Sequence, residues 1–252
     1  MAAHKAVGVD IGGTGVKAAL VDVSTGELLS ERHKVATPQG GEPEDIIAAV
    51  AQLLKELGSP DVEVGVTFPA IVRHGKTMSA ANVSERWIGL EAETLFEQGL
   101  GRDITFVNDA DAAGVAEQQF GAAKDQQGLV IVTTLGTGIG TAFIYRGVLQ
   151  PNTELGHLQW KGEESAETLL SARARERRDL DWPDWGGELT DYYRHLELLF
   201  SPELFVISGG VSKKPEKFVP FIDIETPIAI AKLKNNAGII GAAHLAHLSS
   251  AR

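Results

Sequence analysis

Short apolar runs alternate with segments of helical spacing along most of the chain, a pattern typical of α/β proteins. The order strand, glycine-rich turn, strand, turn, strand occurs near the N-terminus and recurs in mid-chain. The first copy is expected at residues 6–9, 10–15, 16–23 and 28–35, and the second at 129–134, 135–140, 141–145 and from 148 onward. This repetition indicates a duplicated architecture.

Helical spacing and further strands fill the stretches that follow each copy. In residues 43–57 the apolar positions recur on one face, and Gly58 ends the predicted helix. Other helices are expected at 90–98, 109–120, 165–180, 188–199 and 238–248, and other strands at 62–68, 104–107 and 203–208. This order predicts two similar lobes, residues 1–107 and 108–252, with a ligand site in the cleft between them. It leaves open whether the last helix packs back on the N-terminal lobe.

The composition excludes several classes of protein. The 252 residues include 23 Lys and Arg against 34 Asp and Glu, and the net charge of −11 repels nucleic acid and anionic lipid. The absence of cysteine excludes disulfides, thiolate catalysis and cysteine-based zinc sites. The longest apolar stretch, residues 237–243, is far too short for a membrane span. We therefore expect a cytoplasmic protein that binds neither nucleic acid nor membrane.

The first glycine-rich turn, residues 10–15, has the composition of an anion-binding loop. Gly12 and Gly13 let backbone N–H groups approach a phosphate, and Thr14 adds a hydroxyl donor. Asp10 ends a strand and could hold hydrated Mg²⁺. The turn is neither a Walker loop nor a dinucleotide fingerprint, because a strand and not a helix follows it. A tight hairpin with no ligand is the alternative.

The second turn, residues 135–140, would be a plain hairpin if it stood alone. As the counterpart of the first turn, it predicts two phosphate loops, one in each lobe, that together clamp a phosphoryl donor.

Asn108 and Asp109 stand where a strand ends and a helix begins, so one of them is expected to cap the helix. A carboxylate at a strand end in a cleft can also accept a proton from a substrate hydroxyl, and we assign that role to Asp109.

A third polar group comprises Glu154 and His157, with Glu167 ten residues later. Carboxylate and imidazole groups suit the recognition of vicinal hydroxyls. Solvated loop residues are the alternative interpretation.

Taken together and in order, these motifs resemble the ROK family of sugar kinases and repressors, and the resemblance covers essentially the whole chain. It rests on residues 10–14, 108–110, 135–138, 154–157 and 208–210, and the tail 233–241 is similar to that of the short polyphosphate-dependent members. It implies a duplicated actin-like, ribonuclease-H-like ATPase/hexokinase fold. It also implies a kinase that transfers a phosphoryl group from polyphosphate, or from ATP as well, to the 6-hydroxyl of glucose with Mg²⁺, and a homodimer.

The resemblance also assigns roles to residues. Asp109 falls at the catalytic base. The phosphate-binding positions are Asp10, Gly12, Gly13, Thr14, Gly15, Lys17, Gly136, Thr137, Gly138, Gly209 and Gly210. The sugar-binding positions are Asn82, Asn108, Asp109, Glu154, His157 and Glu167.

Two departures from the family pattern matter. Many members carry a structural zinc bound by one His and three Cys, but this chain has no Cys and a short segment from His157 to Glu167, so we predict no zinc. In addition, Ala70 follows Pro69 where the family usually has Pro-Gly.

The donor is the open question. A polyphosphate chain needs a basic track, for which the candidates are Arg173, Arg175, Arg177, Arg178, Lys213, Lys214 and Lys217. Solvated helix faces are the alternative. An ATP-dependent glucokinase, or a broader hexose kinase that accepts mannose, is the second functional interpretation, and a non-catalytic sugar-binding or sensor protein is the third.

Overall fold

The computed structural model describes residues 4–250 and divides into two compact units. Unit 1 comprises Met1–Ala116 and Asn236–Arg252, and unit 2 comprises Glu117–Asn235. The boundary expected after residue 107 therefore lies inside unit 1, which retains most of helix α3 (Asp109–Phe120) and takes up the C-terminal helix α7 (Ala237–Ser250).

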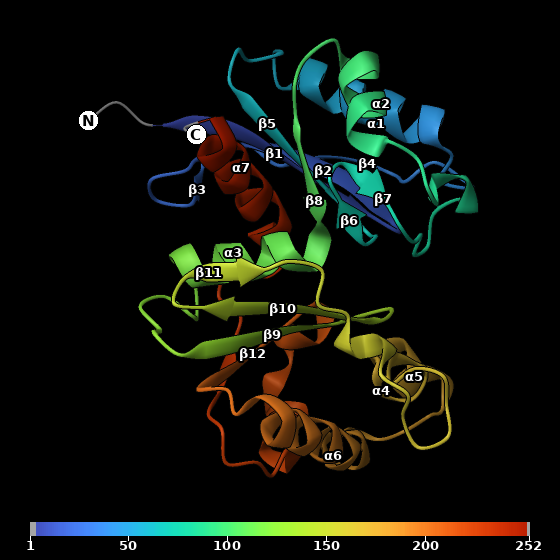
Figure 1. Ribbon diagram of the computed structural model, residues 1–252, viewed down its shortest axis with the longest axis vertical. Helices are drawn as coiled ribbons and strands as arrows, with labels where there is room; N and C mark the ends of the chain where they lie inside the picture. The colour runs from blue at the N-terminus through green and yellow to red at the C-terminus, as the bar shows by residue number, and fades with distance from the viewer. Residues whose placement is uncertain (1–3, 251–252) are drawn as a thin grey trace. The chain divides into compact units, whose positions relative to one another are not determined.

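Unit 1 is built on one mixed sheet in the strand order β3-β2-β1-β5-β8, with β4 also paired to β2 (Figure 1). Strands β1, β2 and β3 are antiparallel neighbours, and β1, β5 and β8 are parallel. The strands are β1 (Lys5–Gly12), β2 (Gly15–Asp22), β3 (Glu27–Leu28), β4 (His33–Val35), β5 (Glu63–Phe68) and β8 (Thr105–Asn108). A small separate hairpin joins β6 (Val72–Arg73) to β7 (Lys76–Thr77).

The core of unit 1 lies between this sheet and two helices, α1 (Pro43–Glu56) and α2 (Ala92–Leu100). Apolar residues at helical spacing in α1 pack there, together with Trp87 of a short 3₁₀ helix (Glu85–Trp87) and Phe96 of α2.

Helix α7 packs on β1 and β5 and is apolar nearly all round, as expected of a buried helix. Its backbone approaches the strands through glycines. A Cβ at Gly8 would lie 1.8 Å from the carbonyl oxygen of Ile239, and a Cβ at Gly65 would lie 2.0 Å from that of Ala242. The last helix thus does pack back on the N-terminal sheet, because glycine on both strands leaves room for its backbone.

Unit 2 repeats the strand order of unit 1, as β11-β10-β9-β12-β13. Strands β9, β10 and β11 are antiparallel neighbours, and β9, β12 and β13 are parallel. The strands are β9 (Leu129–Leu135), β10 (Ile139–Tyr145), β11 (Val148–Gln150), β12 (Leu204–Ser208) and β13 (Ile228–Ile230). The identical pairing pattern confirms the duplicated fold.

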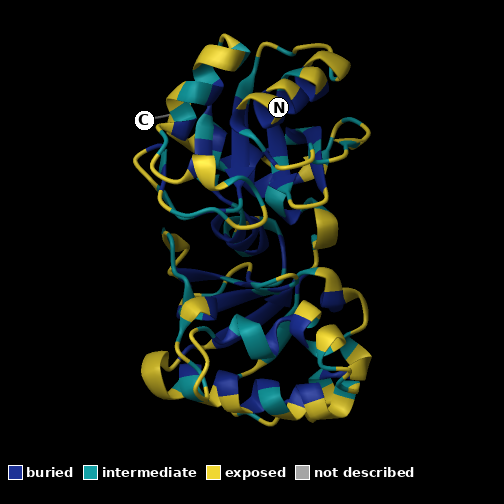
Figure 2. Cartoon of the chain, turned by 90° about the vertical axis from the view of Figure 1, so that its right-hand side faces the viewer, coloured by how far each residue is buried: buried dark blue, intermediate teal, exposed yellow. Residues whose placement is uncertain are grey.

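Three helices accompany the second sheet: α4 (Glu167–Leu170), α5 (Ala172–Arg177) and α6 (Trp182–Phe200). Residues of α6 and strand residues form its core (Figure 2, where the strands of each unit are largely buried). The short 3₁₀ helices of this half are Leu155–His157, Gly210–Lys213, Pro215–Lys217, Val219–Phe221 and Lys234–Asn236.

The expected helix over 165–180 is in fact two helices. Ser171 has an extended backbone (φ −63°, ψ 159°), and its hydroxyl caps α5 by accepting a hydrogen bond from the N–H of Ala174. Helix α6 begins six residues earlier than expected, because the Asp181 side chain caps it. The run expected as one strand at 28–35 is split into β3 and β4.

No helix in residues 4–250 is both long and apolar enough to cross a membrane.

Candidate active site

The first glycine-rich turn is the tip of the β1–β2 hairpin. Gly12 pairs with Gly15 across the strands, and Gly13 and Thr14 are exposed at the tip. Asn82 lies beside this tip, since a Cβ at Gly13 would be 3.1 Å from the Cβ of Asn82. Asn82 has a positive φ of 62°, which asparagine tolerates better than most residues. The structure thus brings a predicted sugar-binding residue next to a predicted phosphate loop.

Asp10, on β1 three residues before Gly13, is held by its neighbours. Its Oδ2 lies 2.8 Å from Nζ of Lys17, the cross-strand partner, and its Oδ1 accepts a hydrogen bond from the Thr67 hydroxyl at 3.2 Å. The first turn of α7 is equally close, because a Cβ at Gly238 would lie 2.9 Å from Oδ1 of Asp10. Thr67 belongs to no motif that the sequence singled out.

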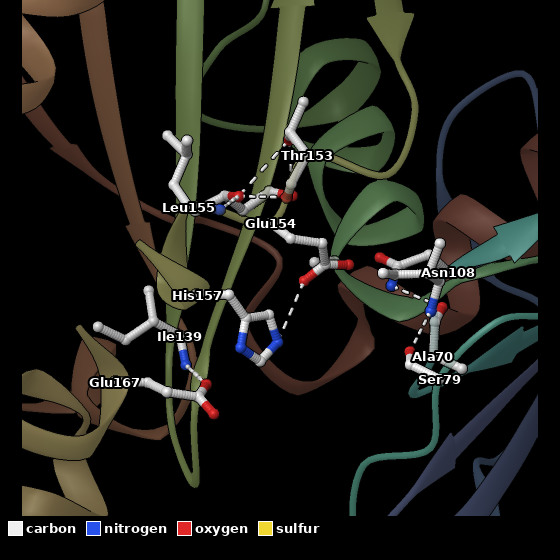
Figure 3. Close-up of polar contacts among 12 residues, drawn as sticks. Ala70, Ser79, Asn108, Ile139, Thr153, Glu154, Leu155, His157 and Glu167 are labelled. Carbon is white, nitrogen blue, oxygen red and sulfur yellow. Dashed lines mark hydrogen bonds and ion pairs between the residues drawn. The ribbon is translucent and has the colours of Figure 1, made fainter. Parts of the chain in front are cut away.

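Asn108, not Asp109, caps helix α3. Its Oδ1 accepts a hydrogen bond from the N–H of Asp111 at 2.9 Å, and its Nδ2 donates to the carbonyl of Ala70 at 2.9 Å (Figure 3). The half-buried Asp109 directs Oδ1 to the N–H of Ala110 at 2.8 Å. Helix capping, one of the two roles expected for this pair, therefore falls to Asn108.

The strand register places Asp10, Asn108 and Asp109 along one edge of the sheet. Asp10 is opposite Thr67 on β5, and Asn108 is opposite Phe68 on the same strand. Asp10 is near the carboxyl end of β1, Asn108 ends β8, and Asp109 follows it. Ligands bind at the carboxyl ends of parallel strands in open α/β sheets.

Ala70, the departure from the usual family glycine, is accommodated without backbone strain. It is not among the residues with positive φ, and its carbonyl accepts the Asn108 hydrogen bond.

The second glycine-rich turn is the tip of the β9–β10 hairpin in unit 2. Leu135 pairs with Ile139, and the N–H of Gly136 donates to the carbonyl of Gly138 at 3.0 Å. Glu167 contacts this loop directly. Its Oε2 accepts a hydrogen bond from the N–H of Ile139 at 3.0 Å, and a Cβ at Gly138 would lie 2.3 Å from the same oxygen. One oxygen of this predicted sugar-binding carboxylate thus holds the second glycine-rich turn.

Gly209, in the Ser-Gly-Gly motif after β12, packs on the same loop. Its φ is 88°, and a Cβ there would lie 2.4 Å from the carbonyl oxygen of Leu135. Gly209 therefore stands directly beside the second glycine-rich turn, in a position that only glycine permits, and Gly210 follows it in open space.

The segment from Glu154 to His157 joins this group through Gly156, whose Cβ would lie 2.1 Å from the carbonyl oxygen of Ile139. Nε2 of His157 is 3.9 Å from Oε2 of Glu154 (Figure 3). Burial raises the pKa of the Glu154 carboxyl, the nearby His157 opposes this rise, and the charge of Glu167 adds to it. Ile139, which lies in the second turn but was assigned no role of its own, contacts both Glu167 and Gly156 of the Glu154–His157 segment.

The predicted site residues thus form two sets, each assembled within one unit. Unit 1 carries Asp10, Gly12, Gly13, Thr14, Gly15, Lys17, Asn82, Asn108 and Asp109, and unit 2 carries Gly136, Thr137, Gly138, Glu154, His157, Glu167, Gly209 and Gly210.

Comparison with known proteins decides the family. The ROK family profile matches residues 6–172, two thirds of the chain. The chain belongs to the ROK family.

Its relatives within the family include named enzymes. The polyphosphate glucokinase of Mycobacterium tuberculosis is 42% identical over 237 residues, covering 94% of this chain and 89% of that protein. The inorganic polyphosphate/ATP-glucomannokinase of Arthrobacter sp. strain KM has a TM-score of 0.93 and 47% identity, over 97% of this chain and 99% of that one. A ROK glucokinase from Streptomyces griseus, solved with glucose and AMPPNP, has a TM-score of 0.80 and 27% identity, over 97% and 99% of the two chains.

For this ROK protein the absence of zinc stays a prediction. Within residues 4–250, no group of three or more His, Cys, Asp or Glu side chains is arranged to hold a metal ion. His157 has the Glu154 carboxylate beside it.

Proposed function

We propose that this protein transfers a phosphoryl group from inorganic polyphosphate to the 6-hydroxyl of glucose. The relatives named above support the reaction, since two of them carry polyphosphate and glucose or mannose in their names. The observation that carries the site assignment is the placement of Asp109 at the carboxyl edge of the unit 1 sheet, on the same edge as the loop that follows Asp10.

In the proposed reaction, the glucose O6 forms a bond to the terminal phosphorus while the bridging P–O bond of the donor breaks. Asp109 accepts the O6 proton as this attack develops. Backbone N–H groups around Gly13 and Gly136, with the hydroxyls of Thr14 and Thr137, bind the donor phosphates. Phosphoryl transfer depends mainly on positioning and charge stabilisation, so these groups suffice.

Asp10 suits Mg²⁺ bound mainly through water and phosphate. It offers one carboxylate, partly exposed and already beside the Lys17 ammonium, and Mg²⁺ at phosphate sites commonly takes one or two protein carboxylates. When bound, the ion would offset the negative charge of the donor.

The predicted sugar-binding residues of each unit are part of the proposal. Asn82 and Asn108 from unit 1, and Glu154, His157 and Glu167 from unit 2, would accept or donate hydrogen bonds to the sugar hydroxyls. Mannose as a second substrate and a homodimeric state belong to the same proposal, and both follow from the family resemblance.

As the pH is lowered, glucose binding should begin to weaken at a higher pH than it would if Glu154 had the pKa of an ordinary glutamate. A charged Glu154 accepts hydrogen bonds from sugar hydroxyls, and its raised pKa means that this acceptor is lost as the pH falls through a value above that of a free glutamate. The glucose KM should therefore rise on the acid side, and Glu154→Gln should have a high KM with a flatter pH profile. A wild-type KM that stays constant down to pH 4.5 would contradict this role.

The acceptor position is tested with glucose and its 6-deoxy analogue. ³¹P NMR of the product from glucose and polyphosphate should show a single phosphomonoester at O6. The analogue lacks the 6-hydroxyl that accepts the phosphoryl group and should give no product. A phosphate at any other hydroxyl, or product from 6-deoxyglucose, would refute the assignment.

ATP-dependent phosphorylation is the second candidate. It is favoured by the Gly209–Gly210 segment beside the second loop and by the similarity to a glucokinase solved with AMPPNP.

A further inference from the structure

The seven basic residues of unit 2 that are candidates for a polyphosphate track separate into two classes by their contacts. Arg178 makes a bidentate ion pair with Glu188, with N–O distances of 2.6 and 2.7 Å. Arg177 donates a hydrogen bond to the carbonyl of Thr168. Both side chains tie α5 to neighbouring helices. The charge of Arg178 is paired with Glu188, and one donor of Arg177 is used by a backbone carbonyl, so both have less to offer a substrate than an unengaged side chain.

The other five of these seven candidates, Arg173, Arg175, Lys213, Lys214 and Lys217, form what we call the cationic strip. They belong to two segments, α5 and the 3₁₀ turns over 210–217. Four of the five are exposed. Arg175 is largely covered, and its Nη1 donates to the carbonyl of Leu180 at 2.9 Å.

Both segments of the strip start at the second phosphate loop. The N–H of Arg173 donates to the carbonyl of Gly136 at 3.1 Å, so α5 leaves directly from that loop. The other segment begins at Gly209, which packs on the backbone of Leu135, and continues through Gly210 to Lys213 and Lys214.

Both segments also end at one side chain, Trp182. The guanidinium carbon of Arg175 lies 4.0 Å from the centre of the Trp182 ring, and Nζ of Lys217 lies 5.7 Å from it. Phe218 packs on the same ring. Residues about forty positions apart in sequence therefore converge at a fixed point, and the cation–π contact orients the Arg175 guanidinium.

Acidic residues lie on and beside the strip as well. Glu176 and Glu216 lie on the same two segments, and Oε1 of Glu176 is 3.9 Å from Nη2 of Arg175. Asp181, next to Trp182, uses its carboxylate to cap α6. Asp179 also lies between α5 and Trp182, so the five cations stand against four carboxylates, on a chain with a net charge of −11.

We propose that the polyphosphate chain lies along the cationic strip, with its reacting end at Gly136–Gly138 and its distal units extending toward Trp182. The proposal rests on the proposed function, since it specifies how the donor is bound. Each phosphate unit carries a negative charge, and successive contacts with Lys and Arg add affinity as units are added. The strip thus predicts a preference for long polyphosphate over tripolyphosphate, and it assigns no donor contact to Arg177 or Arg178.

The test is the double variant Lys213→Ala/Lys214→Ala, with Lys55→Ala/Lys124→Ala as control. The control removes two exposed lysines outside the strip, so both proteins lose the same charge. In the strip variant we expect the KM for long-chain polyphosphate to rise about tenfold and to depend much less on salt concentration. The strip variant should then no longer prefer long-chain polyphosphate over tripolyphosphate. The control should keep that preference.

A binding measurement separates this proposal from the proposed function. Long-chain polyphosphate is titrated into Asp109→Asn protein with and without the two strip lysines, and the lysine substitutions should weaken binding about tenfold. Equal affinity in the two proteins, or an equal rise in KM in the control, would overturn the strip. Turnover with ATP but none with polyphosphate in the wild type would refute polyphosphate as donor, and the titration would still decide whether the strip binds the polyanion.

Discussion

Replacing Asp109 by asparagine should lower kcat for glucose phosphorylation by at least about 100-fold. The amide has the shape of the carboxylate and preserves the hydrogen bond from the N–H of Ala110, but it cannot accept the O6 proton. Helix α3 should remain intact, because Asn108 is its cap. Steady-state kinetics with glucose and polyphosphate measure the loss of turnover.

Glucose binding should survive this substitution within a fewfold, as measured by calorimetric titration. Asp103→Asn provides a matched control, since it removes an exposed carboxylate of the same unit away from the sheet edge. A kcat near wild type in Asp109→Asn, or an equal loss in Asp103→Asn, would show that Asp109 is not the base.

Replacing Gly65 by alanine should reduce the free energy of unfolding by about 3 kcal/mol or more. The added Cβ would lie 2.0 Å from the carbonyl oxygen of Ala242, which is backbone and has no rotamer to change. Helix α7 cannot simply move away, because its backbone also approaches β1 at Gly8. Urea denaturation followed by circular dichroism measures the change.

Gly187→Ala is the matched control for that measurement. Gly187 is exposed on α6 and a Cβ there would contact nothing within 4 Å, so alanine should leave stability unchanged or raise it by about 0.5–1 kcal/mol. Equal stabilities for Gly65→Ala and the wild type would mean that α7 does not depend on these close contacts.

The duplicated order of strands could be predicted because it depends on local patterns. Apolar runs and glycine turns recur in both halves, and the two sheets have the same order and direction of strands. The break at Ser171 was missed, since a hydroxyl that caps a new helix looks like any polar residue within a continuous helical pattern. Strand β13 was missed because three residues carry too little periodicity.

The site was predictable as a set of motifs but not as an arrangement. The choice of Asn108 as helix cap depends on which side chain reaches the N–H of Asp111, and that is a matter of three-dimensional geometry. The proximity of Asn82 to Gly13 joins residues far apart in the chain. The division of the basic residues into engaged and strip cations likewise depends on Glu188 and Trp182, which no motif includes.

The most direct test of the central claim is a comparison of donors. Initial rates of glucose 6-phosphate formation are measured with nucleotide-free protein, Mg²⁺ and glucose, using polyphosphate or ATP in turn. The account predicts sustained turnover with polyphosphate alone, at a kcat/KM at least equal to that with ATP. Turnover with ATP and none with polyphosphate would contradict it.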